Sequence, residues 1–358
     1  MTDAFYSAFY SDFYSMPPRR SSTAAHHEHK HGERKMASFP KYGDLNRPDE
    51  SGLPLSWGAW GEEDQLGTLN NITEDAVREA AGLVTRGVRF NLDLPLDVPF
   101  GVVKPNAHHG GRRSPEQTLI VRNRDNLLVR DDKLDDFYLQ GSTQWDGLTH
   151  MGDARHGFYN GVSEDQVTQQ EGTRNGIEHL AEFGLAGRGV LLDMVRYFAK
   201  ASRDWDVMAQ QTISAQDLEA CMKDQGVAPQ QGDILMVRMG WVGALLAADG
   251  MEARDALLRP WAFSGLSGRE DMWEFLWDNR IAAVAADTVT VEVWPLEKDQ
   301  TSLHLAIARL GITIGEMFNF EALSADCAET GEYRCLFTSS PLNIRGGVGS
   351  PPNAMAIK

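Results

Sequence analysis

The chain has 358 residues, of which 42% are hydrophobic and 24% are charged, and its formal net charge is −17 at pH 7. This composition is typical of a globular protein of one or two domains and excludes a wholly disordered or fibrous chain. The negative charge excludes nucleic acid as a partner, because phosphate binding requires a basic surface.

The cysteine content and the hydropathy limit the cellular compartments in which we expect the protein. The chain has three cysteines and no Cys-x-x-Cys pair, which favours a reducing environment. No stretch approaches the ~18 uninterrupted apolar residues of a membrane span, and the first residues lack the charged and apolar regions of a secretory signal. We therefore expect a soluble, cytoplasmic protein with no membrane partner.

Residues 1–40 differ in composition from the remainder. They open with three near-repeats of Phe-Tyr-Ser, and residues 26–31 include four histidines. Such low complexity cannot bury a core, so we expect a disordered tail over 1–40 and one domain over 41–358. The histidines either bind a transition metal or are incidental to a polar tail, and the aromatic triplets either pack on a partner subunit or belong to that tail.

The globular part alternates between strand and helix patterns. The helical patterns at 73–81 and 214–222 begin with the capping residues Thr73 and Ser214. Strand-like runs, rich in apolar residues and bounded by Gly, Pro or Asp, lie at 117–121, 189–193, 233–238 and 281–287. Helices and strands alternate after residue 185, which predicts a mixed α/β unit without a linker.

One polar segment, residues 139–150, is dense in Asp, His, Gln and Thr. Its centre is Asp146, and His150 follows four positions later. Taken alone this spacing is a weak signal, because an exposed Asp near a hydrogen-bonded His is common in proteins of this size.

A second segment begins at His304. Apolar spacing and Gly311 predict a short helix that ends at the glycine, and a strand over 312–316 should follow directly. A helix that returns into a strand can bring His304 at its start close to Glu316 at the strand end. The alternative reading is a capping histidine and a surface glutamate.

Together the two segments resemble the cyclase family of metal-dependent hydrolases, to which bacterial kynurenine formamidase and isatin hydrolase belong. The family signature H-x-G-T-H-x-D-x-x-x-H falls on residues 140–150, with two histidines replaced by glutamine and Ser142 in place of glycine. The second family pattern, a histidine followed twelve positions later by glutamate, falls on His304 and Glu316. Shorter matches extend the resemblance over roughly 56–358.

The resemblance implies the fold and the assembly. It implies a cyclase-like swivelling β/β/α fold, which is a single mixed α/β domain with a β-barrel-like core. It also implies a homodimer or homotetramer in which subunit contacts complete the pocket.

The departures from the signature change the implied metal centre. Family members with two metals use three histidines of the first signature, and here Gln140 and Gln144 replace two of them. A neutral amide oxygen is a poorer ligand for zinc or manganese than imidazole. The implied ligands that remain are two carboxylates and two imidazoles: Asp146, His150, His304 and Glu316. They suit one divalent ion, Zn or Mn, with Gln140 and Gln144 as weak ligands or water-positioning groups; the alternative is a site that has lost its metal.

The reaction implied by the resemblance is hydrolysis by metal-activated water. The substrate would be a formamide, a cyclic amide or a lactone in a small cyclic or aromatic metabolite, with His150 or His304 transferring a proton. Two alternatives stay open: a cyclase or dehydratase on the same scaffold, and a non-catalytic protein that binds a small ligand at a degraded metal site.

The remaining candidates carry weaker signals. Thr143, Trp145, His156 and Asp287 are expected in the pocket wall, the core or the hydrogen bonds that support the site. The polar loop 108–113 either pairs with an anionic substrate over the pocket or is an ordinary solvated loop. The sequence has no G-x-S-x-G elbow, P-loop or dinucleotide fingerprint, so we expect no nucleotide cofactor.

Overall fold

A computed structural model describes residues 39–99 and 112–358. The predicted tail, apart from its last two residues, and residues 108–111 of the polar loop lie outside this part of the chain. Residues Pro40–Lys358 form one compact unit. Within the described ranges, none of the helices combines the length and the apolar character that a membrane crossing requires.

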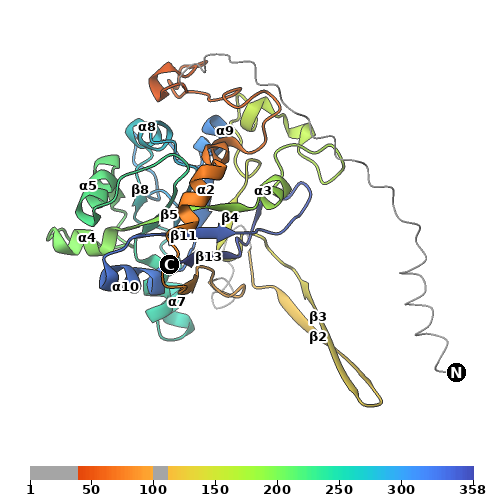
Figure 1. Cartoon of the computed structure of the whole chain (residues 1–358). Coiled ribbons are helices and arrows are strands. Elements are labelled where there is room, and N and C mark those ends of the chain that lie inside the picture. Colours follow the sequence, from red (N-terminus) through yellow and green to blue (C-terminus); the bar gives the residue numbers. More distant parts are fainter. Residues whose placement is uncertain (1–38, 100–111) are drawn as a thin grey trace. The chain divides into compact units, whose positions relative to one another are not determined.

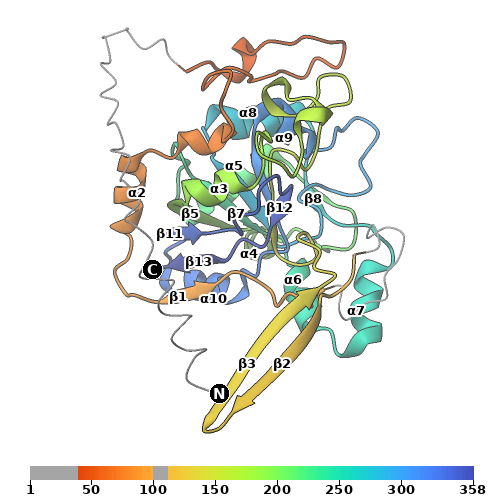
Figure 2. The ribbon, with the colours of Figure 1, turned by 90° about the vertical axis from the view of Figure 1, so that its right-hand side faces the viewer.

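The fold is built on one curled, half-barrel sheet of nine strands in the order β1-β13-β11-β5-β7-β9-β10-β4-β12. Figure 1 and Figure 2 show these strands at the centre, with helices packed around them. The strands are β1 (Arg89–Asn91), β4 (Gln144–Asp146), β5 (Leu185–Asp193), β7 (Ile234–Arg238), β9 (Ala283–Ala286), β10 (Thr313–Glu316), β11 (Arg334–Ser339), β12 (Gly349–Ser350) and β13 (Ala354–Ile357).

The middle of the sheet is parallel and its two sides are antiparallel. Strands β5, β7, β9 and β10 run parallel, whereas β4 and β12 on one side and β11, β13 and β1 on the other are antiparallel to their neighbours. The parallel strands are buried almost throughout, which explains their continuous apolar runs. The predicted mixed α/β fold is confirmed.

Two smaller sheets stand apart from the main one. Strands β6 (Thr212–Ile213) and β8 (Gly265–Leu266) form a short parallel pair. Strands β2 (Glu116–Arg124) and β3 (Leu127–Asp135) form a long antiparallel hairpin. In both views of the ribbon this hairpin extends away from the nine-stranded sheet (Figure 1, Figure 2).

The helices connect the strands and cover the sheet. They are α2 (Glu74–Ala81), α3 (Glu178–Phe183), α4 (Met194–Lys200), α5 (Ala215–Gln225), α6 (Trp241–Ala247), α7 (Gly250–Leu258), α8 (Glu270–Asp278), α9 (Leu305–Leu310) and α10 (Glu321–Thr330). Short 3-10 turns occur at η1 (Tyr42–Asp44), η2 (Gly67–Asn71), η5 (Tyr159–Gly161) and η6 (Glu164–Gln166).

The predicted caps begin their helices. Thr73 accepts a hydrogen bond from the backbone N–H of Ala76, 3.1 Å, at the start of α2. Ser214 accepts one from Asp217 at the start of α5. Each cap satisfies an N–H group that has no partner within its helix, which is why the short polar side chain marks the boundary.

Gly311 joins α9 to β10 and fixes the turn between two predicted site residues. Its φ is +70°, and a Cβ atom there would lie 2.6 Å from Cε2 of Tyr159 and 2.9 Å from Cα of Gly67. The helix can therefore end and the strand begin within two residues only if position 311 has no side chain.

We expect Gly311→Ala to lower the free energy of unfolding by about 3 kcal/mol or more, because left-handed strain adds to a steric clash. Gly331→Ala is the matched control: Gly331 also ends a helix at φ +71°, but no atom lies within 4 Å of its Cβ position. That variant should lose only about 1–2 kcal/mol. Urea denaturation measures both, and equal losses would contradict the close packing at Gly311.

Candidate active site

Strand pairing places three polar side chains on one face of the sheet. In the antiparallel pair of β4 and β10, Glu316 lies opposite Gln144 and Ile314 opposite Asp146. Side chains alternate along a strand, so Gln144, Asp146 and Glu316 share a face while Trp145 points to the other. Gln144 Nε2 accordingly donates to Glu316 Oε2 at 2.8 Å and lies 3.4 Å from Asp146 Oδ1.

The two predicted histidines approach this face from different segments. His304 stands immediately before α9, and its Nε2 lies 3.1 Å from Glu316 Oε1 and 3.6 Å from Asp146 Oδ2. His150 follows β4, with Nδ1 3.6 Å from Asp146 Oδ1. Asp146, His150 and His304 each offer an atom within 4.8 Å of the others. The structure therefore brings together all four residues that the sequence suggested as ligands.

Glu292 is a site residue that the sequence analysis missed. Its Oε2 lies 2.6 Å from Nδ1 of His304, and its Oε1 accepts a hydrogen bond from Ser302, also 2.6 Å. This arrangement favours a proton on Nδ1 of His304 and leaves Nε2 directed at Asp146 and Glu316. The only available signal was a lone glutamate in the apolar run 289–293, whose three valines are buried.

Burial and mutual repulsion act on the protonation of the carboxyl groups. Burial, together with the neighbouring Asp146 and Glu292, raises the pKa of Glu316 to about 7. Burial alone would raise the pKa of Asp146, but His150 and His304 outweigh it and the pKa is lowered. Burial also opposes the charge on Glu292, and His304 reverses that effect and lowers the pKa of Glu292.

His304 is surrounded by these carboxylates. Burial by itself would lower its pKa, but the charge of Glu292 and the contacts with Asp146 and Glu316 raise it well above the ordinary value. Three carboxylates and two imidazoles thus share one buried cluster, which carries more potential negative than positive charge.

Two buried oxygen atoms in the cluster bear on whether a metal ion would fit there. Asp146 Oδ2 and Gln144 Oε1 are both inaccessible and have no hydrogen-bond partner among the described residues. A buried carboxylate oxygen without a partner is costly, and a cation is the group that would satisfy it. With two imidazoles and two carboxylates adjacent, the donor set fits a divalent ion of the zinc or manganese type.

The cluster opens into a cavity of about 330 Å³. Its lining combines four charged or imidazole groups of the cluster with apolar walls and one arginine: His150, Glu292, His304, Glu316, Met151, Trp261, Val289, Thr290, Trp294, Ser302 and Arg112. Arg112 belongs to the predicted polar loop and donates a hydrogen bond to the backbone oxygen of Gln140, 3.0 Å. Burial raises the pKa of Asp146, and the charge of Arg112 adds to the effect of the two histidines that lowers it.

Three other predicted residues, Thr143, Trp145 and Asp287, are buried and form hydrogen bonds with groups outside the cluster. Thr143 donates to the backbone oxygen of Met317, 2.7 Å, and Trp145 is a core residue whose Nε1 donates to Ser339. Asp287 is buried and accepts the backbone N–H groups of Met239 and Gly240 at 2.5 and 2.8 Å.

Gln140 and His156 differ in their distance from the cluster. Gln140 Nε2 lies 3.4 Å from Nδ1 of His150, so this amide borders the site. His156 is not among the residues that line this cavity, and its Nε2 lies 2.6 Å from Asp49 Oδ2. Asp49 also binds Arg309, and this partly buried ion pair holds His156 in place.

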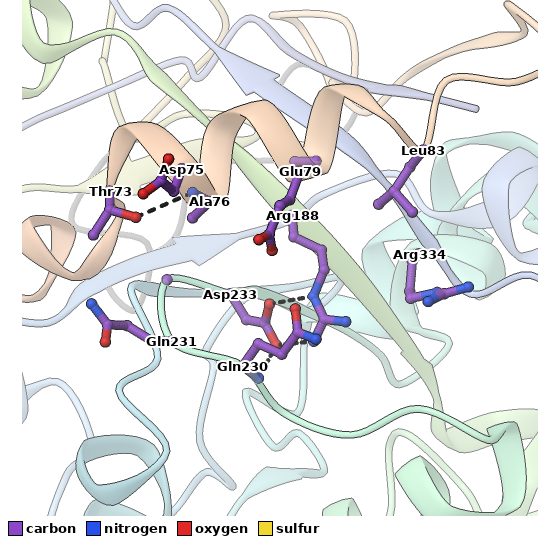
Figure 3. A pocket seen from close by; sticks show the side chains of 12 residues that line it. Thr73, Asp75, Ala76, Glu79, Leu83, Arg188, Gln230, Gln231, Asp233 and Arg334 are labelled. Atoms are coloured by element: carbon purple, nitrogen blue, oxygen red, sulfur yellow. Dashed lines mark hydrogen bonds and ion pairs between the residues drawn. The ribbon is translucent and has the colours of Figure 1, made fainter.

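A second hollow, of about 440 Å³, lies beside α2. Figure 3 shows one of its charged groups, Arg188, directed at Asp233; the Nε–Oδ1 and Nη2–Oδ2 distances are 2.7 and 2.8 Å. None of its lining side chains is among the buried polar groups without a partner in the described part of the chain. The unsatisfied atoms Asp146 Oδ2 and Gln144 Oε1 belong to the cluster beside the first cavity and not to this hollow.

Comparison with known proteins agrees with the sequence resemblance. The family model "Putative cyclase" matches residues 94–293. A solved structure described as a novel cyclase is 32% identical and superposes with a TM-score of 0.73, covering 85% of this chain and 99% of its own. No curated protein sequence gives a significant match.

Two more distant structures share the fold. Isatin hydrolase A from Labrenzia aggregata, bound to benzyl benzoate, is 15% identical with a TM-score of 0.53, covering 77% of this chain and 94% of its own. Isatin hydrolase A from Ralstonia solanacearum is 14% identical with the same TM-score, covering 80% of this chain and 98% of its own.

The raised pKa of Glu316 gives a stability prediction for protein freed of metal with a chelator. The folded state binds this proton more tightly than the unfolded state, so the contribution to stability is complete below the ordinary pKa of 4.5 and is lost as the pH rises through about 7. Glu316→Gln removes the titration but keeps an oxygen for Gln144. Between pH 4.5 and 8, wild type should lose up to about 3 kcal/mol relative to Glu316→Gln. Urea denaturation across this range measures the difference, and a constant difference would contradict the raised pKa.

Proposed function

The chain belongs to the cyclase family, and on that premise we propose that it is a metal-dependent hydrolase. It cleaves the C–N bond of a formamide or cyclic amide, or opens a lactone, in a small cyclic or aromatic molecule. The two isatin hydrolases with the same fold are named as hydrolases, which supports this reaction class. The observation that carries the proposal is Asp146 Oδ2, a buried oxygen without a hydrogen-bond partner, whose nearest charged neighbour is Nε2 of His304 at 3.6 Å.

One divalent ion, zinc or manganese, would be held by two carboxylates and two imidazoles: Asp146, His150, His304 and Glu316. These four groups can balance the charge of a single ion. Gln140 and Gln144 stand where the family signature has histidines, and their neutral amides do not complete a second site. When bound, such an ion lowers the pKa of a water molecule and polarises a substrate carbonyl.

His304 and His150 have different roles in this proposal. Both nitrogens of His304 are engaged, by Glu292 on one side and by Asp146 and Glu316 on the other, so His304 serves as a fixed ligand. His150 is more exposed and lines the cavity. The ring nitrogen of His150 that does not bind the ion is therefore better placed than either nitrogen of His304 to move a proton to or from the leaving group.

The cavity lining supports the substrate class. Trp261 and Trp294 offer apolar surfaces to a ring, and a volume of about 330 Å³ is at the small end for ligand pockets. Arg112 is the cation of the lining and lies on the same cavity as His150. Its guanidinium is suited to bind the oxygen atoms of a carboxylate or of a polarised carbonyl on the substrate.

Metal content tests the proposal directly. Full-length protein contains a histidine-rich segment at residues 26–31 that can bind metal, so a variant without residues 1–38 is measured beside it. We expect about one equivalent of zinc or manganese per chain, lost in Asp146→Ala and His150→Ala because each removes a ligand. His156→Gln, whose histidine lies outside the cavity, is the control and should retain the metal. Absence of metal, with none taken up on addition, would contradict the proposal.

Isotopically labelled water distinguishes hydrolysis from cyclisation or dehydration. The metal-loaded protein is screened with formamides, cyclic amides and lactones, and the products are analysed by mass spectrometry. We expect one labelled oxygen atom in the product, because hydrolysis adds water across the cleaved bond. Turnover without incorporation would contradict hydrolysis.

The proposed role of Arg112 in substrate binding is tested by comparing its substitution with that of the neighbouring Arg113. For a substrate that carries a carboxylate, Arg112→Ala should raise KM by about 10- to 100-fold with a smaller effect on kcat, because a charged hydrogen bond contributes about 1.5–3 kcal/mol. Arg113→Ala is the matched control, since Arg113 is exposed and paired with Asp136. Equal effects of the two substitutions would contradict the assignment.

A further inference from the structure

Glu292 contacts a different ring nitrogen of His304 from the other carboxylates of the cluster. Its Oε2 lies 2.6 Å from Nδ1, whereas Glu316 Oε1 and Asp146 Oδ2 lie 3.1 and 3.6 Å from Nε2. The other oxygen of Glu292 is also engaged, because Oε1 accepts a hydrogen bond from Ser302 at 2.6 Å. Both oxygens of Glu292 therefore have partners, in contrast to Asp146, whose Oδ2 has no hydrogen-bond partner among the described residues.

The backbone of Glu292 is fixed by the neighbouring strand β8. Leu266 donates its N–H to the carbonyl oxygen of Val291 and accepts the N–H of Val293, each at 3.0 Å. These two bonds lie on either side of Glu292, which pairs with Leu266 in a parallel bridge. The approach is so close that a Cβ atom at Gly265 would lie 2.3 Å from the carbonyl carbon of Glu292. The carboxylate is thus attached to a backbone segment that cannot easily move away from His304.

A carboxylate at Nδ1 makes an imidazole a better ligand at its other nitrogen. It holds the proton on Nδ1, so that the lone pair of Nε2 is free to bind a cation. Its negative charge increases the basicity of the ring, and its hydrogen bond opposes rotation of the ring. Nε2 of His304 accordingly stays directed at Asp146 and Glu316.

We propose that Glu292, held by Ser302, is a positioning residue that sets the affinity of the site for its ion through His304. This inference rests on the metal-dependent function proposed above. The carboxylates of Asp146 and Glu316 balance the two charges of a divalent ion, which leaves the charge of Glu292 to act on the imidazole. The presence of a third buried carboxylate in the cluster then has a physical reason.

Binding of Mn²⁺ to the full-length chain, followed by the electron paramagnetic resonance signal of the free ion, tests the proposal. Mn²⁺ binds nitrogen ligands more weakly than the later first-row ions, which limits its uptake by the histidines of residues 26–31. We expect Glu292→Ala to raise the Kd for Mn²⁺ by about 10- to 100-fold, because His304 loses its hydrogen-bond acceptor. Glu292→Gln should raise the Kd less, since its amide oxygen can still accept the proton of Nδ1.

Two further measurements separate positioning from a general effect on the fold. Ser302→Ala leaves the carboxylate in place but removes the group that holds Oε1, so it should raise the Kd by less than Glu292→Ala does. It also tests the proposal independently of whether Glu292→Ala folds. The visible absorption bands of bound Co²⁺ depend on the donors around the ion, and we expect them to shift in Glu292→Ala and to return toward the wild-type positions in Glu292→Gln.

Glu178 provides the matched control. It is also a buried glutamate, and its Oε2 accepts the backbone N–H of Gly346 at 2.9 Å, but it is not among the residues that line the cavity. Glu178→Ala should lower the stability to urea and leave the Kd for Mn²⁺ and the Co²⁺ spectrum unchanged.

The outcomes distinguish this inference from the proposed function. A wild-type protein that binds neither Mn²⁺ nor Co²⁺ would overturn both. A wild-type protein that binds Mn²⁺ would overturn this inference alone if the Kd were unchanged in Glu292→Ala and Ser302→Ala, or if Glu178→Ala raised it equally.

Discussion

The buried contact between His304 and three carboxylates is the constraint around which the site is arranged. Asp146, Glu292 and Glu316 all lie close to one imidazole, at distances between 2.6 and 3.6 Å. Burial of several carboxylates is unfavourable unless their charge is balanced. In the protein alone, part of that balance comes from the raised pKa values of His304 and Glu316. A divalent ion would balance the cluster more completely and would occupy the side of Asp146 that no hydrogen bond serves.

The fold holds this cluster through elements that are themselves deeply buried. The β4–β10 register sets Gln144, Asp146 and Glu316 on one face, while Trp145 locks β4 into the core from the other face. Gly311 allows α9 to turn directly into β10, which fixes the separation of His304 and Glu316. The positions of Asp146, His304 and Glu316 thus depend on the backbone geometry of β4, α9 and β10.

The sequence was informative wherever function depended on local spacing. The helix that starts at His304, its glycine end and the strand that ends at Glu316 were predicted because they follow from short-range patterns. The parallel strands were predicted because burial on both faces leaves a continuous apolar run. The nine-stranded order could not be derived from these patterns, since pairs such as β4 with β10 and β5 with β11 join segments more than a hundred residues apart.

The parts that escaped prediction share a physical reason. Glu292 is one polar residue in an apolar strand-like run, and only its contact with His304 reveals its role. Arg112 reaches the cavity from a loop whose composition is equally typical of a solvated surface. The run 117–121 was identified as a strand, but its pairing with β3 emerges only from the register. The position of His156 beside Asp49 also depends on a contact between distant segments, which spacing along the chain does not reveal.

The central claim is that one divalent ion sits among Asp146, His150, His304 and Glu316. Crystals of the manganese-loaded protein, with diffraction recorded at a wavelength where manganese scatters anomalously, would test it most directly. We predict a single anomalous peak per chain, within bonding distance of Asp146 Oδ2 and of Nε2 of His304. Two peaks, with Gln140 and Gln144 as ligands of the second, or a peak away from this cluster, would contradict the account.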